Sequence, residues 1–229
     1  MHALLSGQPG ERRLLLGNEA IVRGALEAGV ALATTYPGTP ASEIGDRFYQ
    51  LSQESDLYFE YSTNEKVALE VAAGAAASGI RAMCSMKHVG MNVAADAFMT
   101  LSYTGIKGGL LIVVADDPNV HSSQNEQDSR NWARFGKAPM LEPADAQECK
   151  DFTKIAFDIS EKFDTPVFLR TETRVAHADS PVTLEDRKES KIALGLDQKE
   201  ASCLVRSTPW RYLIFYSYPN CISVCLHRQ

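Results

Sequence analysis

The sequence predicts an α/β fold, built as a parallel sheet with helices on both faces. Strand-like and helix-like segments alternate through residues 14–175, and such alternation is typical of repeated strand–helix units. Residues 109–115, GLLIVVA, are apolar on both sides of an extended chain, as expected for a central strand that is covered on both faces.

Local signals along the chain predict the individual elements. A helix over 18–28 is expected to be capped by Asn18 and ended by Gly29. Residues 36–40, YPGTP, contain two prolines that exclude helix and strand. Pro143 is expected to open a helix whose buried face carries Phe152, Ile155, Ala156, Ile159 and Phe163. The other expected elements are strands 31–35, 57–61, 80–86, 109–115, 140–142 and 166–170, and helices 41–52, 64–78 and 91–103.

Composition limits the class of protein. The chain has 229 residues, of which 45% are hydrophobic and 23% charged, and this fits one globular domain with a tail. The net charge of −6 and the lack of a basic stripe argue against a nucleic-acid partner. No run of about 20 apolar residues is present, so we expect no membrane span.

The cysteines and the N-terminus favour a cytoplasmic protein. Residues 1–13 lack the apolar core of a secretion signal, and five cysteines is an odd number. Cys84 and Cys149 are expected to be buried apolar residues. Cys221 and Cys225 have no partner pair, so no metal site is expected.

The C-terminal segment differs from the rest of the chain. Residues 201–229 contain no acidic residue and five aromatic ones. We therefore expect one domain over 12–187 and an atypical tail over 188–229. A truncated or frame-shifted reading frame would explain such a tail, and a natural split gene is the alternative.

The segments that follow the predicted strands are where a ligand is expected. In open parallel sheets, ligands bind at the carboxyl ends of the strands. Four segments occupy that edge here: 36–40, 62–65, 86–92 and 116–128. The last is a long polar loop, which is uncommon in a compact domain unless it binds something.

Ser62-Thr-Asn-Glu65 has two interpretations. Its spacing fits a capping box, in which Ser62 and Glu65 bond each other's backbone amides, and spacing alone favours this interpretation. However, the helix that follows is rich in small apolar residues, which suggests that it is buried on most sides, including against another chain. A carboxyl group in such a partly dry environment holds a proton more readily and can act as a proton donor.

Met86-Lys-His-Val-Gly-Met-Asn92 follows the predicted strand 80–86. Lys87 and His88 are either surface residues at a strand end or site residues beside the candidate acid. Gly90 is expected to permit a sharp turn into the next helix.

Four motifs together resemble a known family. They are Tyr36-Pro-Gly-Thr-Pro-Ala-Ser-Glu43, Asn64-Glu-Lys-Val-Ala-Leu-Glu70, Met86-Lys-His-Val-Gly-Met-Asn-Val-Ala-Ala-Asp96 and His121-Ser-Ser-Gln-Asn-Glu-Gln-Asp128. In this order and spacing they resemble the amino-terminal domain of the alpha subunit of indolepyruvate ferredoxin oxidoreductases, over about residues 12–187. That family belongs to the thiamine diphosphate-dependent 2-oxoacid:ferredoxin oxidoreductases, and this domain is its pyrimidine-binding module.

The resemblance implies roles for five residues. The family's glutamate at the position of Glu65 bonds the N1′ atom of the cofactor's aminopyrimidine ring, which makes Glu65 the expected catalytic residue. Thr39 corresponds to a threonine that lies beside substrate and cofactor in related pyruvate enzymes. His88 is expected to line the substrate side and Asn92 the cofactor side. Lys87 is a hypothetical partner of the substrate carboxylate, because Asp116-Asp117 stands where some relatives have an arginine.

The resemblance also implies partners. The complete enzyme decarboxylates an aryl 2-oxoacid oxidatively to an acyl-CoA and passes electrons through [4Fe-4S] clusters to ferredoxin. It needs Mg²⁺, further alpha-subunit modules and a gamma- or beta-type subunit, so the isolated chain is expected to be inactive. A dimeric contact through helix 64–78 is also expected. The alternatives are a pyrimidine-module subunit of a non-oxidative 2-oxoacid decarboxylase and a non-catalytic remnant domain.

Overall fold

A computed structural model of the chain describes residues 2–188. The predicted tail and the Cys221/Cys225 pair lie outside these residues. Within them, the main sheet has six parallel strands in the order β3-β2-β4-β5-β7-β6. The strands are β2 (Leu32–Thr35), β3 (Tyr58–Tyr61), β4 (Ala82–Lys87), β5 (Leu110–Asp116), β6 (Met140–Leu141) and β7 (Val167–Glu172). The predicted α/β class with a parallel sheet is confirmed.

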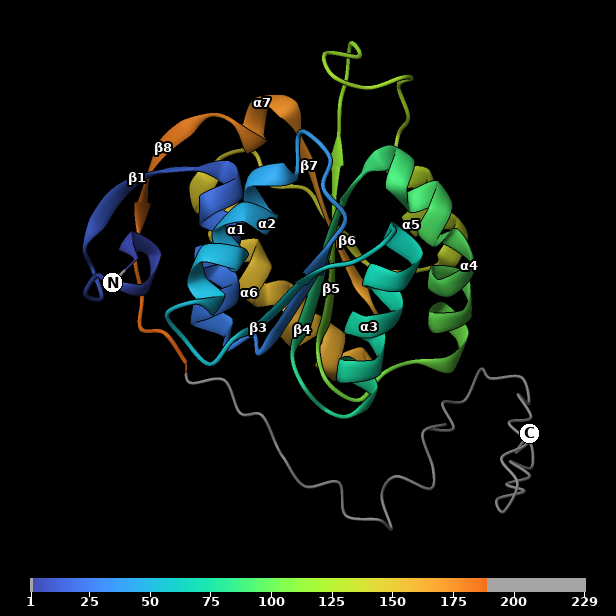
Figure 1. The fold of residues 1–229 in the computed structure, drawn as a ribbon, viewed down its shortest axis with the longest axis horizontal. Helices are drawn as coiled ribbons and strands as arrows, with labels where there is room; N and C mark the ends of the chain where they lie inside the picture. Colours follow the sequence, from blue (N-terminus) through green and yellow to red (C-terminus); the bar gives the residue numbers. More distant parts are fainter. Residues whose placement is uncertain (1, 189–229) are drawn as a thin grey trace.

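Helices cover both faces of this sheet, as Figure 1 shows. On one face lie α1 (Gly17–Ala28), α2 (Ser42–Ser52) and α6 (Ala146–Phe163). On the other lie α3 (Glu65–Ala77), α4 (His88–Thr104) and α5 (Arg130–Gly136). The polar loop predicted over 116–128 lies one residue later, over 117–129, because Asp116 still belongs to β5 and α5 begins at Arg130.

A second, two-stranded sheet was not predicted. It pairs β1 (Arg12–Leu16) with β8 (Asp179–Thr183) in antiparallel fashion, close to a short 3₁₀ helix, η1 (Ala3–Leu5), and to α7 (Thr173–Ala176). The two strands come from opposite ends of the domain. No turn signal joins them in the sequence, so local patterns could not identify the pair.

Two hydrophobic clusters fill the space between sheet and helices. Strand β5 alternates between them: Leu111, Val113 and Ala115 belong to one cluster. Its other residues Leu110, Ile112 and Val114 belong to the second, as the two-residue period of a strand requires. Each of these side chains is fully buried, and burial of a Val, Leu or Ile side chain stabilises a fold by about 1.5–3 kcal/mol. The prediction of a strand covered on both faces is confirmed.

Helix α1 begins differently from the prediction. It starts at Gly17, and the Glu19 carboxylate accepts the N–H of the N-cap residue Leu16 at 3.3 Å. Asn18 is not the cap. Its buried amide instead donates to the Pro40 carbonyl and to the Glu43 carboxylate, each at 2.8 Å, and so ties α1 to the turn after β2. Gly29 ends the helix in the left-handed conformation, as predicted.

The predictions for α6 were wrong in two respects. The helix starts at Ala146 under an Asp145 cap, three residues after Pro143. Ile155 and Phe163, which were expected to be buried, are 45% and 59% exposed. The predicted Ala156 is buried, and Phe152 and Ile159 pack partly buried against the core. The fully buried face consists of Ala146, Cys149, Lys150, Thr153, Ala156, Phe157 and Ser160.

Close packing against α1 explains why small and polar residues form this face. A methyl group at Gly24 of α1 would lie 2.4 Å from the backbone oxygen of Lys150, so the two helices touch through their backbones. Lys150 and Glu27 are fully buried and pair at 3.2 Å, while Arg23 pairs with Glu27 at 2.9 Å. Apolar periodicity does not identify a buried face that carries charges in this way.

The polar loop after β5 is anchored at both ends. Asp116 is buried and accepts from Arg170 at 2.6 Å and from the Ser129 hydroxyl at 2.5 Å. Arg170 also contacts Glu142 and Glu172. This ion-pair cluster closes the base of the loop, whose tip projects beyond the sheet in Figure 1.

Asp117 fixes the first part of the same loop. Its carboxylate accepts the backbone N–H of Ser122 at 2.8 Å, the Ser123 hydroxyl at 2.7 Å and the Thr173 hydroxyl at 2.8 Å. Burial by itself raises the pKa of Asp117, but these hydrogen bonds outweigh burial and hold the pKa well below its ordinary value.

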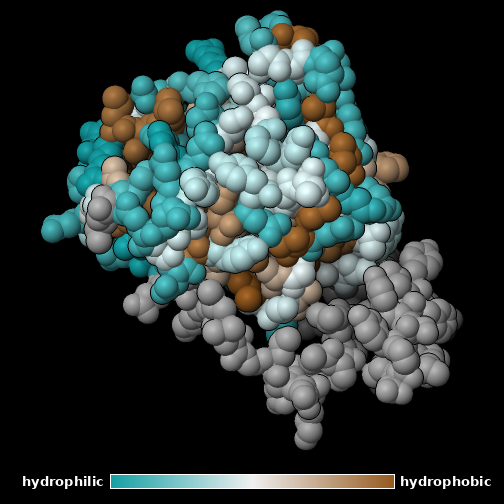
Figure 2. All heavy atoms as spheres, viewed as in Figure 1, coloured by the Kyte–Doolittle hydropathy of each residue, from teal (hydrophilic) through white to brown (hydrophobic). Residues whose placement is uncertain are grey.

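The surface of the described residues carries both hydrophilic and apolar side chains. Figure 2 shows mostly hydrophilic residues on one face, interrupted by several separate apolar patches. Within residues 2–188, no helix has the length and apolar character needed to cross a membrane.

A pair of Gly-to-Ala substitutions tests the α1–α6 contact. Gly24→Ala is expected to lower the free energy of unfolding by about 1–3 kcal/mol, because the added methyl group overlaps the α6 backbone. Gly74→Ala in α3 is the control, because a methyl group there meets no atom within 4 Å. It should stabilise the chain by about 0.8–1 kcal/mol through helix propensity. Urea unfolding measures both, and equal effects would contradict the packing argument.

Replacement of Asp117 by Asn is expected to cost about 1–3 kcal/mol near pH 7, because Ser122, Ser123 and Thr173 lose the charge of a buried carboxylate acceptor. A depressed pKa means that the carboxylate stabilises fully above its unfolded pKa of about 3.9, and that this contribution disappears as the pH falls through the folded-state pKa. Urea unfolding near pH 7 and near pH 3 should therefore give a smaller difference between parent and variant at the lower pH. An unchanged difference would refute this role for Asp117.

Candidate functional site

The candidate site lies where the carboxyl ends of the main strands meet, at the upper edge of the sheet in Figure 1. Helix α3 begins at this edge directly after β3. Its cap is Asn64, whose side chain accepts the N–H of Val67 at 3.0 Å. Ser62 instead donates to Glu60 at 2.8 Å, so the predicted capping box between Ser62 and Glu65 is wrong. Glu65 is therefore the first helical residue, and its carboxylate is not used to cap the helix.

Glu65 is buried, with 8% of its surface exposed. Across residues 2–188, no hydrogen bond or ion pair to its carboxylate is found. Two neighbours define its position. The Glu65 side chain lies against Gly90 of α4, where a methyl group would come within 2.6 Å of its Oε1 atom. Burial raises the pKa of the Cys84 thiol in β4 to about 12, and the nearby Glu65 charge adds to this rise.

The junction between β4 and α4 also differs from the prediction. Helix α4 starts at His88, not at residue 91, and Lys87 is its N-cap residue. Gly90 therefore lies inside the first turn of the helix, with no positive φ angle, and does not form a sharp turn. Residues 87–90 consequently contact three different segments of the site within a single turn of helix.

Lys87 contacts the turn after β2 and the loop after β5. Its aliphatic chain packs on Gly38, where a methyl group would lie 2.8 Å from its Cδ atom. Its Nζ atom donates to the Ser122 carbonyl at 3.1 Å. Ser122 in turn donates weakly to the backbone oxygen of Thr39 at 3.5 Å. The exposed Thr39 and the half-buried Lys87 are thus brought into one cluster.

His88 is fully buried beneath the same loop. Its Nε2 atom lies 3.0 Å from the Asn125 carbonyl, which can only accept, so Nε2 carries the proton of this hydrogen bond. The Nδ1 atom is buried and has no hydrogen-bond partner. His88 therefore supports the loop on one side and retains one unused nitrogen on the other.

Asn92 is not brought to Glu65. It is exposed on α4, two residues after Gly90, and two residues correspond to about 200° around a helix. Its side chain therefore points away from the Glu65 contact. Its cofactor-binding role stays a prediction.

Asp116 and Asp117, at the position where some relatives have an arginine, are both engaged in anchoring the loop. Among the described residues, no group of three or more His, Cys, Asp or Glu side chains is arranged to hold a metal ion. The ligand-binding capacity of this edge therefore rests on Glu65, Lys87, His88 and the exposed backbone and hydroxyl groups near Thr39.

Three contacts in this site, made by Ser122, Asn125 and Gly90, were not predicted from the sequence. Ser122 and Asn125 act through backbone carbonyls, for which a sequence carries no signal. Gly90 was noticed, but its contact with Glu65 joins residues on different helices. Only a family-wide comparison of positions 65 and 90 could have indicated that contact.

Comparisons with known proteins identify the family of this chain. The family described as "Pyruvate flavodoxin/ferredoxin oxidoreductase, thiamine diP-bdg" matches residues 23–209. The indolepyruvate oxidoreductase subunit IorA of Pyrococcus horikoshii is 54% identical over 196 residues, covering 84% of this chain and 30% of that protein. The 2-oxoglutarate synthase subunit KorA of Methanothermobacter thermautotrophicus is 28% identical over 183 residues, covering 77% of this chain and 49% of that protein.

A solved structure shows the same fold. It is the 2-oxoglutarate:ferredoxin oxidoreductase from Magnetococcus marinus, with a TM-score of 0.68 at 18% identity, covering 80% of this chain and 34% of that chain. The present chain spans about 30% of the length of the IorA relatives that it matches. Because the family match extends over most of its residues, the chain belongs to the pyruvate flavodoxin/ferredoxin oxidoreductase family, within its thiamine diphosphate-binding domain.

Proposed function

We propose that this chain is the pyrimidine-binding part of a thiamine diphosphate-dependent indolepyruvate:ferredoxin oxidoreductase, acting in the cytoplasm on an aryl 2-oxoacid. The observation that carries the proposal is the Glu65 carboxylate, which is 8% exposed at the ligand-binding edge of a parallel sheet and has no hydrogen-bond partner in residues 2–188. The 54% identity to an indolepyruvate oxidoreductase subunit supports the choice of substrate.

The residues at this edge fit the pyrimidine half of the cofactor. An aminopyrimidine ring nitrogen needs a carboxyl group that is free to bond it, and a largely buried carboxyl group that no protein donor engages gains a partner when such a ligand binds. Glu65 meets this need, because neither the helix cap nor an ion pair uses its carboxylate. Thiamine diphosphate, when bound, supplies the carbon nucleophile that adds to a 2-oxoacid and stabilises the charge left as CO₂ departs.

Glu65 itself would hold and exchange one proton at the pyrimidine nitrogen. Two features suit it to this task. Its low exposure strengthens a hydrogen bond with a ligand, because little water competes. Contact with Gly90 limits where the carboxyl group can lie, so that the bond would be made in a fixed direction.

Lys87 is the proposed partner of the substrate carboxylate. An ammonium group has three N–H donors, and the structure shows one bond from Lys87, to a neutral carbonyl. No carboxylate pairs with Lys87 within residues 2–188, so its charge is available to an anion. Thr39 and the unused Nδ1 atom of His88 are the proposed neighbours of the substrate's polar groups.

Other modules would complete the enzyme. The IorA relatives are more than three times as long as the matched part, which leaves room for modules that hold the diphosphate, Mg²⁺ and [4Fe-4S] clusters. Coenzyme A, ferredoxin and a gamma- or beta-type subunit are the further proposed partners.

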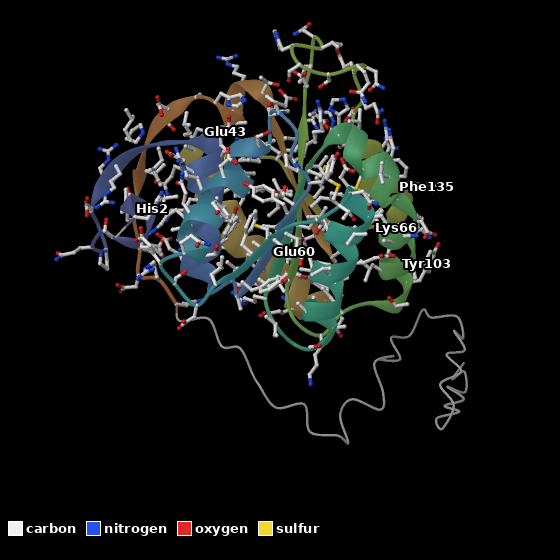
Figure 3. All side chains as sticks on the ribbon, in the orientation of Figure 1. His2, Glu43, Glu60, Lys66, Tyr103 and Phe135 are labelled. Atoms are coloured by element: carbon white, nitrogen blue, oxygen red, sulfur yellow. The ribbon has the colours of Figure 1, made fainter. Side chains whose placement is uncertain are left out.

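A contact through α3 is proposed for assembly. Its buried residues face the domain core, whereas Glu70 and Gly74 are exposed, so α3 is less enclosed than its composition suggested. Figure 3 shows Lys66 of α3 on the same flank as Tyr103 and Phe135. The two aromatic side chains are 51% and 70% exposed, and such a surface suits a partner module.

Complementation tests the proposed role of Glu65. The chain is mixed with the remaining modules and the partner subunit of an IorA relative, thiamine diphosphate, Mg²⁺ and coenzyme A, and indolepyruvate-dependent reduction of an artificial acceptor is followed. Glu65→Gln is expected to lower kcat by at least about 100-fold, because the amide cannot exchange a proton. The chain alone should give no turnover.

Glu43→Gln, at another carboxylate near this edge, is the control and should retain most activity. Release of an aldehyde without acceptor reduction would instead indicate the non-oxidative decarboxylase. Full activity of the Glu65→Gln complex would contradict the proposal, and a folded but inactive parent chain would indicate a remnant domain.

Lys87→Gln tests the substrate carboxylate contact in the same complex. Loss of the ammonium group is expected to raise the KM for indolepyruvate by about tenfold or more, since a charge-assisted hydrogen bond contributes about 1.5–3 kcal/mol. Lys87→Arg should restore part of the loss. Lys162→Gln, at the far end of α6, is the matched control for removal of one positive charge. An unchanged KM in Lys87→Gln would exclude this role.

A further inference from the structure

A side chain at position 90 would collide with the side chain of Glu65. A methyl group at position 90 would lie 2.6 Å from both Cγ and Oε1 of Glu65, and 2.9 Å from Cδ. Carbon atoms that are not bonded to one another do not approach so closely, so the glutamate side chain occupies the space where a side chain at position 90 would lie. The two residues come from different helices, α3 and α4.

The backbone does not explain why glycine stands at this position. Within residues 2–188, the glycines with positive φ angles are Gly7, Gly10, Gly29, Gly79 and Gly105, and Gly90 is not among them. It lies within the first turn of the 17-residue helix α4, where alanine is the better helix former. The three heavy atoms nearest to a methyl group placed at Gly90 all belong to the Glu65 side chain. Glycine is therefore needed at this position for steric reasons.

We propose that Gly90 is a positioning residue for Glu65. By leaving its side-chain volume empty, Gly90 lets the Glu65 carboxyl group rest against the first turn of α4. Displacement of that group would move the hydrogen-bonding oxygen away from its ligand. This inference rests on the proposed function of Glu65 as the residue that bonds the pyrimidine ring.

The contact itself can be tested in the chain without cofactor. Thermal unfolding is measured for the parent, Gly90→Ala, Glu65→Ala and the double variant. Gly90→Ala is expected to lower Tm by about 3 °C or more in the parent, since the buried glutamate has to move. In the Glu65→Ala background the same change should leave Tm unchanged or raise it, because the space is then empty.

Gly74→Ala is the control for helix propensity, because a methyl group there meets nothing within 4 Å. It should have the same effect on Tm with or without Glu65. If the effects of Gly90→Ala and Glu65→Ala simply add, the steric contact is absent and the proposal is overturned.

The positional role is tested in the reconstituted complex. The readout is hydrogen–deuterium exchange at C2 of bound thiamine diphosphate, together with kcat and KM for indolepyruvate. Gly90→Ala is expected to slow the exchange and lower kcat by about 100-fold, with KM unchanged, because a misplacement of about 1 Å is sufficient for such a loss. Thr100→Ala, on the exposed side of the same helix, is expected to change neither.

The outcomes separate this inference from the proposed function. If Glu65→Gln abolishes exchange but Gly90→Ala does not slow it, the positioning role of Gly90 is overturned and the function stands. If Glu65→Gln leaves exchange unaffected, the proposed function is wrong, and Gly90 has no positioning role in catalysis. The unfolding data would still show whether the contact between Gly90 and Glu65 exists.

Discussion

The direct passage from β4 into α4 is the constraint on which the candidate site depends. No loop separates Lys87, the last residue of the strand, from His88, the first residue of the helix. Within one turn, Lys87 therefore contacts the segment after β2, His88 holds the loop after β5, and Gly90 meets Glu65 of α3. A shift in the register of β4 would disturb all three contacts together. Because β4 lies between β2 and β5 in the sheet, strand pairing on both sides opposes such a shift.

Buried charges hold the surroundings of this junction in place. Arg170 and Asp116 pair beneath the long loop, and Lys150, Glu27 and Arg23 pair between α1 and α6. Replacement of a buried ion pair by apolar residues is often neutral for stability, so these pairs are weak evidence of a stabilising role. Loss of one partner, however, leaves an uncompensated charge, and each pair therefore enforces one arrangement of the segments that it joins. For the loop, that arrangement presents Ser122 and Asn125 to α4.

The alternation of strand-like and helix-like segments and the uninterrupted apolar run of β5 were sufficient to predict the parallel sheet. Glu65 was selected as a candidate by the resemblance of four motifs to a known family, whereas its spacing favoured a helix cap. Interactions between distant segments escaped prediction. Strands β1 and β8 pair although more than 160 residues separate them, and α6 buries Lys150 instead of Ile155 because an ion pair and a close helix contact outweigh hydrophobic periodicity. The start of α4 was missed for a related reason. His88 and Gly90 are poor helix-start signals, and their place in the helix is set by partners on other elements.

The Glu65 carboxylate has no structural role in the described chain, and this supports a functional one. The Ser62–Glu65 spacing favoured a capping box, in which a carboxylate at the third helical position (N3) accepts the backbone N–H of the cap residue. Asn64 provides the cap instead, which moves Glu65 to the first helical position and leaves its carboxylate without a hydrogen bond in the described chain. Partial burial of such a group opposes folding, and the glycine that makes room for it opposes helix formation as well. A carboxylate at position 65 and a helical glycine at position 90 are both unfavourable for stability, and an apolar pair at these positions would avoid both costs. Such residues are expected at a site where a bound ligand supplies the missing interactions, because departures from the residue choices that favour stability are expected at functional sites.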